Sequence, residues 1–147
     1  MRALLKTDNS AALLFSRMAL GIVMFPHGAQ KVLGWFGGSG YEKTVELFTT
    51  KMNFSLGLVI AFLIAEFAGS LCLIAGFFTR VFAFAIGFSL VLCAYMNHLK
   101  NGFFMNWFGK QSGEGFEFHI LAVGMALALV IGGGGAFSLD RAFARKK

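Results

Sequence analysis

Apolar positions in this chain are grouped into long continuous runs rather than into short alternating stretches. The clearest run covers residues 54–78, with Glu66 as its only charge, and is longer than the roughly 20 residues that a membrane-crossing helix needs. A second run, residues 80–98, follows at once, and the only break between the two is Thr79-Arg80. The two runs are therefore predicted to form a tight antiparallel helical hairpin.

Two further runs, residues 11–33 and 116–136, complete the pattern. The first has an apolar middle, Met18 to Phe25, but also contains polar residues: Arg17, Pro26, His27, Gln30 and Lys31. The last begins with Glu117 and His119 and ends in the glycine run 132–135, which would release a helix. The prediction is an all-α fold, with residues 1–147 forming one integral membrane four-helix bundle.

Composition supports lipid rather than water as the solvent. Apolar residues make up 57% of the chain, 19 residues are Phe and 14% are charged, whereas a soluble domain is typically about 25% charged. The net charge of +6 is not spread over a face that could bind nucleic acid. Seven of the 13 basic residues lie at the chain ends or at the hairpin turn, where membrane proteins place cytoplasmic charge: Arg2, Lys6, Arg80, Arg141, Arg145, Lys146 and Lys147.

This charge distribution predicts that the N-terminus and the C-terminus are both cytoplasmic. The longer connections, residues 34–53 and 96–115, then face outward and are nearly neutral. Aromatic residues suited to the lipid headgroup level gather near this surface: Trp35, Tyr41, Tyr95 and Trp107. A cleaved signal peptide is the alternative for the first run, but Arg17 interrupts its apolar part and no A-x-A-like cleavage site follows.

Small residues four apart predict where helices approach closely, because lipid provides no hydrophobic force between them. They are Ala61, Ala65 and Gly69, then Ala83 and Gly87, and finally Gly124 and Ala128. Cys72 and Cys93 belong to no C-x-x-C pair and to no metal-spaced cluster with histidine. They are interpreted as apolar filler near opposite membrane surfaces, unpaired, and no metal site is predicted.

The chain resembles a known family in several short motifs. They are Arg17, Leu20-Gly21, Pro26-His27-Gly28, Lys31, Gly34-Trp35-Phe36-Gly37-Gly38, Ala65-Glu66, Gly69, Thr79-Arg80, His98, Asn101-Gly102-Phe103-Phe104 and Glu117-Phe118. With these motifs over about residues 11–140, the chain resembles the DoxX family of small four-helix membrane proteins. The resemblance implies a four-helix bundle and, by analogy with the quinol oxidase subunit that gave the family its name, a link to quinone oxidoreductases.

Ionisable groups inside membrane spans are costly and usually face a partner, a cavity or a pathway. By helical period, Arg17, Gly21, Met24, His27, Gly28 and Lys31 share one face of the first run, which should point into the bundle. Arg17 is predicted to pair with Glu66. The pair would either have an essential function or only fix the register of the helices.

The other polar residues of the spans are predicted to line a pocket that opens outward. They are His27, Gln30, Lys31, His98, Glu117 and His119. Such a pocket would suit a quinone headgroup or a similar small polar molecule, with His27 able to pass protons near neutral pH. The alternatives are that these residues only snorkel to the interface, or that two histidines hold a haem, for which no C-x-x-C-H motif is present.

Two classes of function remain open. One is a quinone-interacting or accessory subunit of a membrane redox system, which needs a cofactor or a redox partner because side chains of these kinds cannot carry electrons between substrates. The other is a non-enzymatic scaffold or a small-solute binder or transporter. Both place the chain in a bacterial-type inner membrane as a multi-pass protein, and a homo-oligomer is compatible with either.

Overall fold

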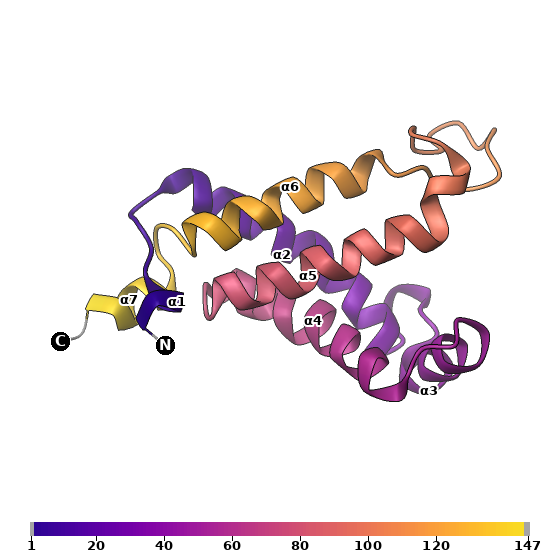
Figure 1. The fold of residues 1–147 in the computed structure, drawn as a ribbon, viewed down its shortest axis with the longest axis horizontal. Helices are drawn as coiled ribbons and strands as arrows, with labels where there is room; N and C mark the ends of the chain where they lie inside the picture. Colours follow the sequence, from indigo (N-terminus) through magenta and orange to yellow (C-terminus); the bar gives the residue numbers. More distant parts are fainter. Residues whose placement is uncertain (1, 146–147) are drawn as a thin grey trace.

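The protein folds into four long antiparallel helices with short helices at both ends (Figure 1). The structure is a computed structural model and describes residues 2–145. Every element in that range is helical. In chain order the elements are α1 (Arg2–Leu5), α2 (Ala11–Val32), η1 (Trp35–Gly37), α3 (Gly40–Glu46), η2 (Leu47–Lys51), α4 (Leu56–Ala75), α5 (Thr79–Cys93), η3 (Ala94–His98), η4 (Leu99–Asn101), α6 (Glu117–Gly132) and α7 (Leu139–Arg145).

Three helices are long and apolar enough to cross a membrane. They cover Ala11–Val32, Leu56–Ala75 and Thr79–Asn101, the last formed by α5 with its extensions η3 and η4. The apolar helix α6 has 16 residues, or about 24 Å at 1.5 Å per residue, and is shorter than the other three. Large apolar side chains such as Phe84, Leu121 and Ile131 remain exposed on the bundle. The fold is therefore that of a helical membrane protein, as the sequence predicts.

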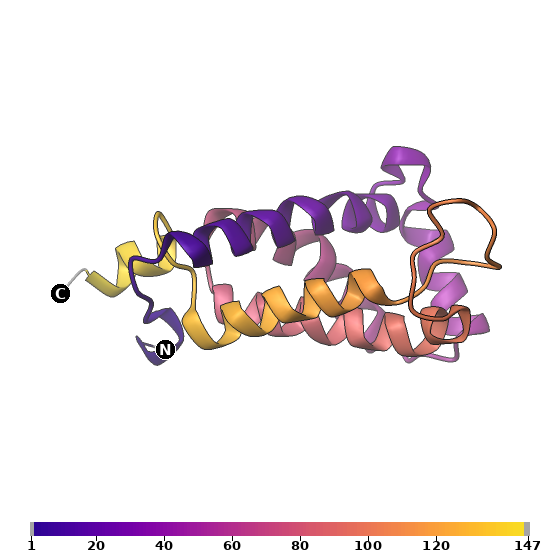
Figure 2. The same cartoon turned by 90° about the horizontal axis from the view of Figure 1, so that it is seen from above.

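The two ends of the bundle differ in character. The short helices α1 and α7 lie at one end together with the turn between α4 and α5, and both chain termini lie there too (Figures 1 and 2). We call this the terminal end. Helix α3 and the long connection from 102 to 116 lie at the opposite end, which we call the loop end.

Helices α2 and α4 approach each other at two glycines of α2. A Cβ on Gly28 would lie 2.6 Å from the backbone of Phe67, and one on Gly21 would lie 3.0 Å from the carbonyl oxygen of Ser70. Side chains could not fit there, so the glycines set the distance between the helices. They also set the register, because Gly28 is level with the middle of α4 and Gly21 with its last turns.

The predicted small-residue contacts are correct for α5 and for Ala65 and Gly69 of α4, but wrong for the exposed Ala61 of α4 and for α6. A Cβ on Gly69 would touch Phe82, and one on Gly87 would lie 3.0 Å from Ala126. In α6, by contrast, Gly124 and Ala128 are exposed. Ala122 and Ala126 are buried instead, in a core that also contains Leu20, Leu73, Ile86 and Leu129. The four-residue spacing alone did not distinguish the two faces of α6, which is apolar all round.

Arg17 is only 1% exposed and binds backbone carbonyls at the terminal end. Its Nη1 donates to the carbonyl oxygens of Leu73 (2.8 Å) and Ile74, in the last turn of α4. Its Nε and Nη2 donate to carbonyls of the irregular segment after α6: Gly134 (3.0 Å), Ala136 (3.3 Å) and Phe137 (3.5 Å). Non-helical backbone away from water needs such internal partners, and Arg17 supplies them.

At the terminal end, two more charged side chains bind backbone groups that are left free at the ends of helices. Asp140 accepts hydrogen bonds from the backbone N–H groups of Phe78 (2.7 Å) and Thr79 (2.8 Å), at the N-terminus of α5. Arg80 donates to the carbonyls of Val130 and Ile131 in the last turn of α6. Each charge matches the helix dipole that it faces, negative at an N-terminus and positive at a C-terminus.

Candidate functional site

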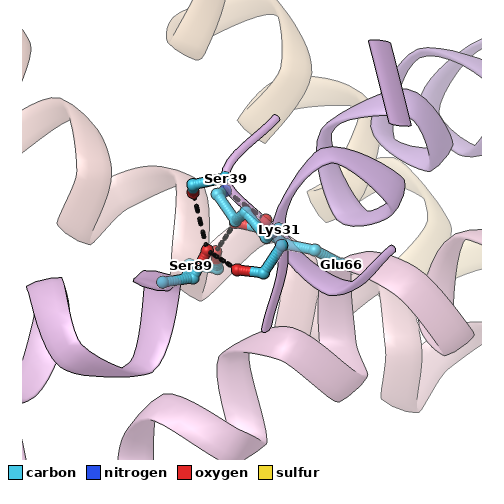
Figure 3. A network of polar contacts seen from close by, with 6 residues as sticks. Lys31, Ser39, Glu66 and Ser89 are labelled. Atoms are coloured by element: carbon cyan, nitrogen blue, oxygen red, sulfur yellow. Dashed lines mark hydrogen bonds and ion pairs between the residues drawn. The ribbon is translucent and has the colours of Figure 1, made fainter. Parts of the chain in front are cut away.

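An ion pair between a buried carboxylate and a partly exposed lysine lies inside the bundle towards the loop end. Glu66 of α4 is 7% exposed, pairs with the ammonium of Lys31 from α2, and accepts a hydrogen bond of 3.0 Å from Ser89 of α5 (Figure 3). Three helices thus meet at one carboxylate. Both of its oxygens are satisfied, as a carboxylate away from water requires.

The predicted pair between Arg17 and Glu66 is wrong. The glycine contacts fix α2 and α4 in an antiparallel register that puts Glu66 level with residues 28–31 of α2. Arg17, fourteen residues before Lys31, is therefore level with the end of α4, where carbonyls are its partners. Sequence periodicity correctly placed both residues on inward faces, but it carried no information on the relative heights of the helices.

A cavity of about 340 Å³ opens beside the ion pair, between α2, α4, α5 and α6. Four of the residues predicted to form a pocket line it: His27, Lys31, His98 and His119. Their side chains come from two long helices, α2 and α6, and from η3. Glu66 and Cys93 line the same cavity, although the sequence analysis assigned Glu66 to another pair and Cys93 to apolar packing.

Gln30 and Glu117 do not line this cavity. The amide of Gln30 donates to the carbonyl of Phe36 (3.2 Å), in the turn after α2. Glu117 accepts hydrogen bonds from the backbone N–H of Met105 (3.0 Å) and the indole of Trp107 (3.3 Å), so it holds the long connection against the start of α6. Its predicted inward face, which includes Leu121, is exposed in the structure.

Two apolar spaces adjoin the cavity. A smaller one of about 110 Å³ lies on the other side of the ion pair and shares Lys31, Glu66 and Cys93 with it. An open groove of about 520 Å³ runs between α5 and α6, lined by apolar side chains and by one edge of His119. The polar groups therefore lie between the 110 Å³ space and the apolar groove between α5 and α6.

Cys93, His98 and His119 form a cluster that the sequence spacing did not indicate. Their potential ligand atoms all lie within 4.8 Å of one another, and the two imidazole rings are 4.4 Å apart between centroids. In an α-helix, residues five apart point about 140° away from each other. Here residues 94–98 form a π-helical turn, in which Leu99 N–H donates to the carbonyl of Ala94 five residues earlier, so Cys93 and His98 share a face.

The interpretation of Cys93 as apolar filler without histidine neighbours was therefore wrong. The one usable signal in the sequence is the Cys-x₄-His spacing at the end of an apolar run, and it becomes informative only when the turn is known to be π-helical. His119 completes the cluster from α6, which is separated in sequence from His98 by the long connection. Cys72, by contrast, lies in α4 away from the cluster, and both cysteines are free thiols.

These observations define a multi-pass helical membrane protein with an ion pair around a buried carboxylate and a cavity between its helices that several polar side chains line. The comparisons with known proteins agree: the DoxX family model matches residues 12–99, and the chain belongs to that family. It is 30% identical over 143 residues to "Inner membrane protein YqjF" of Escherichia coli (strain K12), covering 97% of this chain and 99% of that protein. No solved structure matches the chain. The protein is accordingly a multi-pass protein of the inner membrane.

Proposed function

We propose that the protein binds a quinone headgroup in the 340 Å³ cavity and acts as a quinone-interacting or accessory subunit of a membrane redox system. The observation that carries this proposal is the gathering of Lys31, His27, His98 and His119 around one cavity in an otherwise apolar bundle. Small-molecule sites have this character, with a mainly apolar lining and a few polar groups that fix orientation.

The two ends of a quinone match two features of the site. Its carbonyl oxygens accept hydrogen bonds, which Lys31 and the rings of His27 and His119 can donate. Its isoprenoid tail is apolar and long, and the groove between α5 and α6 offers it a path from the region of His119 to lipid. Because His119 borders both spaces, it is the residue at which headgroup and tail would meet.

Reduction of a quinone to a quinol takes two electrons and two protons. Histidine can pass protons near neutral pH, but none of these side chains carries electrons from one substrate to another. The proposal therefore includes a partner redox subunit as the electron donor or acceptor. On this basis we assign the chain to binding and proton transfer and leave electron transfer to the partner.

We infer that α6 is the fourth span and that the terminal end is cytoplasmic. Seven of the 13 basic residues lie near the termini or at Arg80, whose guanidinium donates to the carbonyl oxygen of Lys6, just after α1, at the same end of the bundle. The loop end would then face outward, and the cavity, which lies towards that end, would open to the outer face of the membrane. A quinone would enter from the outer leaflet.

The ion pair favours a second candidate, a binder or transporter of a small polar solute. Lys31 and Glu66 separate the two cavities, and ionisable residues between spaces inside a bundle often mark a path. This function would need no redox partner. The two candidates differ in what the purified protein retains, a lipid-soluble quinone or a water-soluble solute.

The decisive experiment is extraction and mass spectrometry of quinones from the protein purified in mild detergent, with visible absorption to detect haem. We expect stoichiometric quinone in the native protein and a loss of at least about tenfold in His27→Ala. Gln30→Ala is the matched control, because Gln30 lies on the same helix but does not line the cavity. Absence of quinone from native protein that is stabilised by a polar solute would favour the transport function instead.

A further inference from the structure

We propose that Cys93, His98 and His119 bind a transition-metal ion, with Zn²⁺ as the first candidate. One thiolate and two imidazoles are the ligands that zinc and copper prefer, whereas Mg²⁺ and Ca²⁺ take oxygen ligands. The site lies on the wall of the cavity but does not depend on quinone binding.

The geometry is close to that of a bound metal. In a tetrahedral zinc site, bonds of about 2.0–2.3 Å place neighbouring ligand atoms about 3.3–3.6 Å apart. The ligand atoms of the cluster lie within 4.8 Å of one another. Side-chain rotations that shorten these separations by up to about 1.5 Å would complete the site.

His119 gives independent evidence for a missing ligand. Its side chain is 7% exposed, and its Nδ1 is buried without a hydrogen-bond partner among the described residues. A buried polar atom without a partner is unfavourable by about 1–3 kcal/mol and calls for an explanation. A metal ion that unites His119 with the thiol and the other imidazole would remove that penalty.

His98 is already oriented as a metal-binding histidine should be. Its Nδ1 lies 2.9 Å from the backbone carbonyl oxygen of Glu114, to which it can donate. That hydrogen bond fixes the tautomer in which Nε2 carries a free lone pair. Metal-binding histidines almost always have such a partner on the second nitrogen.

Three protein ligands leave one position of a tetrahedral zinc open. Structural zinc sites use four protein ligands, while sites that act on a bound molecule keep a place for water or for that molecule. The cavity borders all three proposed ligands, so the open position would be accessible to a small oxygen-bearing ligand. The proposed site is thus a binding site for a polar ligand as well as for the metal.

The first test measures metal in the detergent-purified protein after dialysis against Zn²⁺, and the spectrum of the Co²⁺ form. We expect one metal per chain and a thiolate-to-cobalt absorption band. Both should be lost in Cys93→Ser and His119→Gln, with a fall in affinity of more than about 100-fold. Cys72→Ser and Gln30→Ala are matched controls that keep the proposed ligands and lie outside the cavity. Equal metal binding by Cys93→Ser and the native protein, or no metal in either, would overturn the proposal.

The second test leaves the cluster intact and so does not depend on how its variants fold. In a Cys72→Ser protein, the remaining thiol is Cys93, and its alkylation rate is followed by mass spectrometry. Zn²⁺ should slow alkylation at least about tenfold, Mg²⁺ should not, and a chelator should restore the rate. An alkylation rate that Zn²⁺ does not change would refute the site. Quinone extracted from the same samples tests the proposed function separately.

Discussion

Arg17 and Glu66 show two ways of keeping a charge inside an apolar bundle. Glu66 has a cation and a hydroxyl as partners, so its charge is balanced directly. Arg17 binds carbonyl oxygens of two separate segments, the last turn of α4 and the chain after α6. The guanidinium is suited to this because it carries five N–H donors in a fixed plane. Glu66 organises the cavity, and Arg17 organises the terminal end.

Replacing Arg17 should destabilise the protein without emptying the cavity. Arg17→Met would leave several buried carbonyls without donors, and we expect a loss of about 3–5 kcal/mol in the free energy of unfolding in detergent. Arg141→Met is the control, because Arg141 makes one exposed hydrogen bond to Asn9, and it should change stability by less than about 1 kcal/mol. Equal effects of the two substitutions would refute this role for Arg17.

The ion pair should respond differently to single and double substitution. Lys31→Met would leave the Glu66 carboxylate without its cation and should destabilise the protein by about 3 kcal/mol, at the low end of the usual range because Lys31 is partly exposed. Adding Glu66→Gln should restore at least half of that loss, because the buried charge is removed. Denaturant titrations of Lys31→Met, Glu66→Gln and the double variant measure the coupling between the two side chains. Additive effects would show that the two side chains do not interact.

At the scale of elements, the contact between α2 and α4 determines the geometry of the site. Gly21 and Gly28 bring α2 against the backbone of α4, and this contact puts Lys31 beside Glu66. Small residues at helix contacts are typical of membrane bundles. The consequence here is specific, because a different register would separate the charged partners.

Glycines of α2 and α6 should differ sharply in their tolerance of alanine. At Gly28 a Cβ would meet the backbone of Phe67 at 2.6 Å, so Gly28→Ala should push the helices apart and destabilise the protein by about 2–3 kcal/mol. At Gly124 a Cβ has nothing within 4 Å, and Gly124→Ala should be neutral or stabilising by up to about 1 kcal/mol. Unfolding in detergent compares the two. A similar loss in both variants would contradict this packing.

At the scale of the whole molecule, the proposed orientation has a direct test. Fusions of green fluorescent protein, which fluoresces when it remains in the cytoplasm, and of alkaline phosphatase, which is active after export, report the side of each segment. We expect fluorescence from a fusion at the C-terminus and phosphatase activity from one at Lys110. The opposite pattern would place the cavity on the cytoplasmic side and reverse the proposed entry of the quinone.

Much of the architecture could be predicted because burial in lipid leaves a strong pattern in a sequence. The long apolar runs correctly predicted the helices. Four of the residues expected to form a pocket, His27, Lys31, His98 and His119, line one cavity, while their role as a binding site stays a prediction. Two kinds of error remain. Arg17 was given the wrong partner because periodicity gives the face of a residue and not its height. Glu117 was placed on a face of α6 that is exposed, because a helix that is apolar all round does not reveal its inward face.

The sequence by itself determined that lipid surrounds the protein, that its fold is all-helical and which family it belongs to. Each of these follows from local composition, run length and short motifs. Tertiary structure alone decided which polar groups meet. The contact of Gly28 with Phe67 set the register that pairs Lys31 with Glu66, and the π-helical turn brought Cys93 onto the same face as His98. Both depend on distances between segments far apart in the chain or on a local change of helical period, and neither is encoded in the spacing of an ideal α-helix.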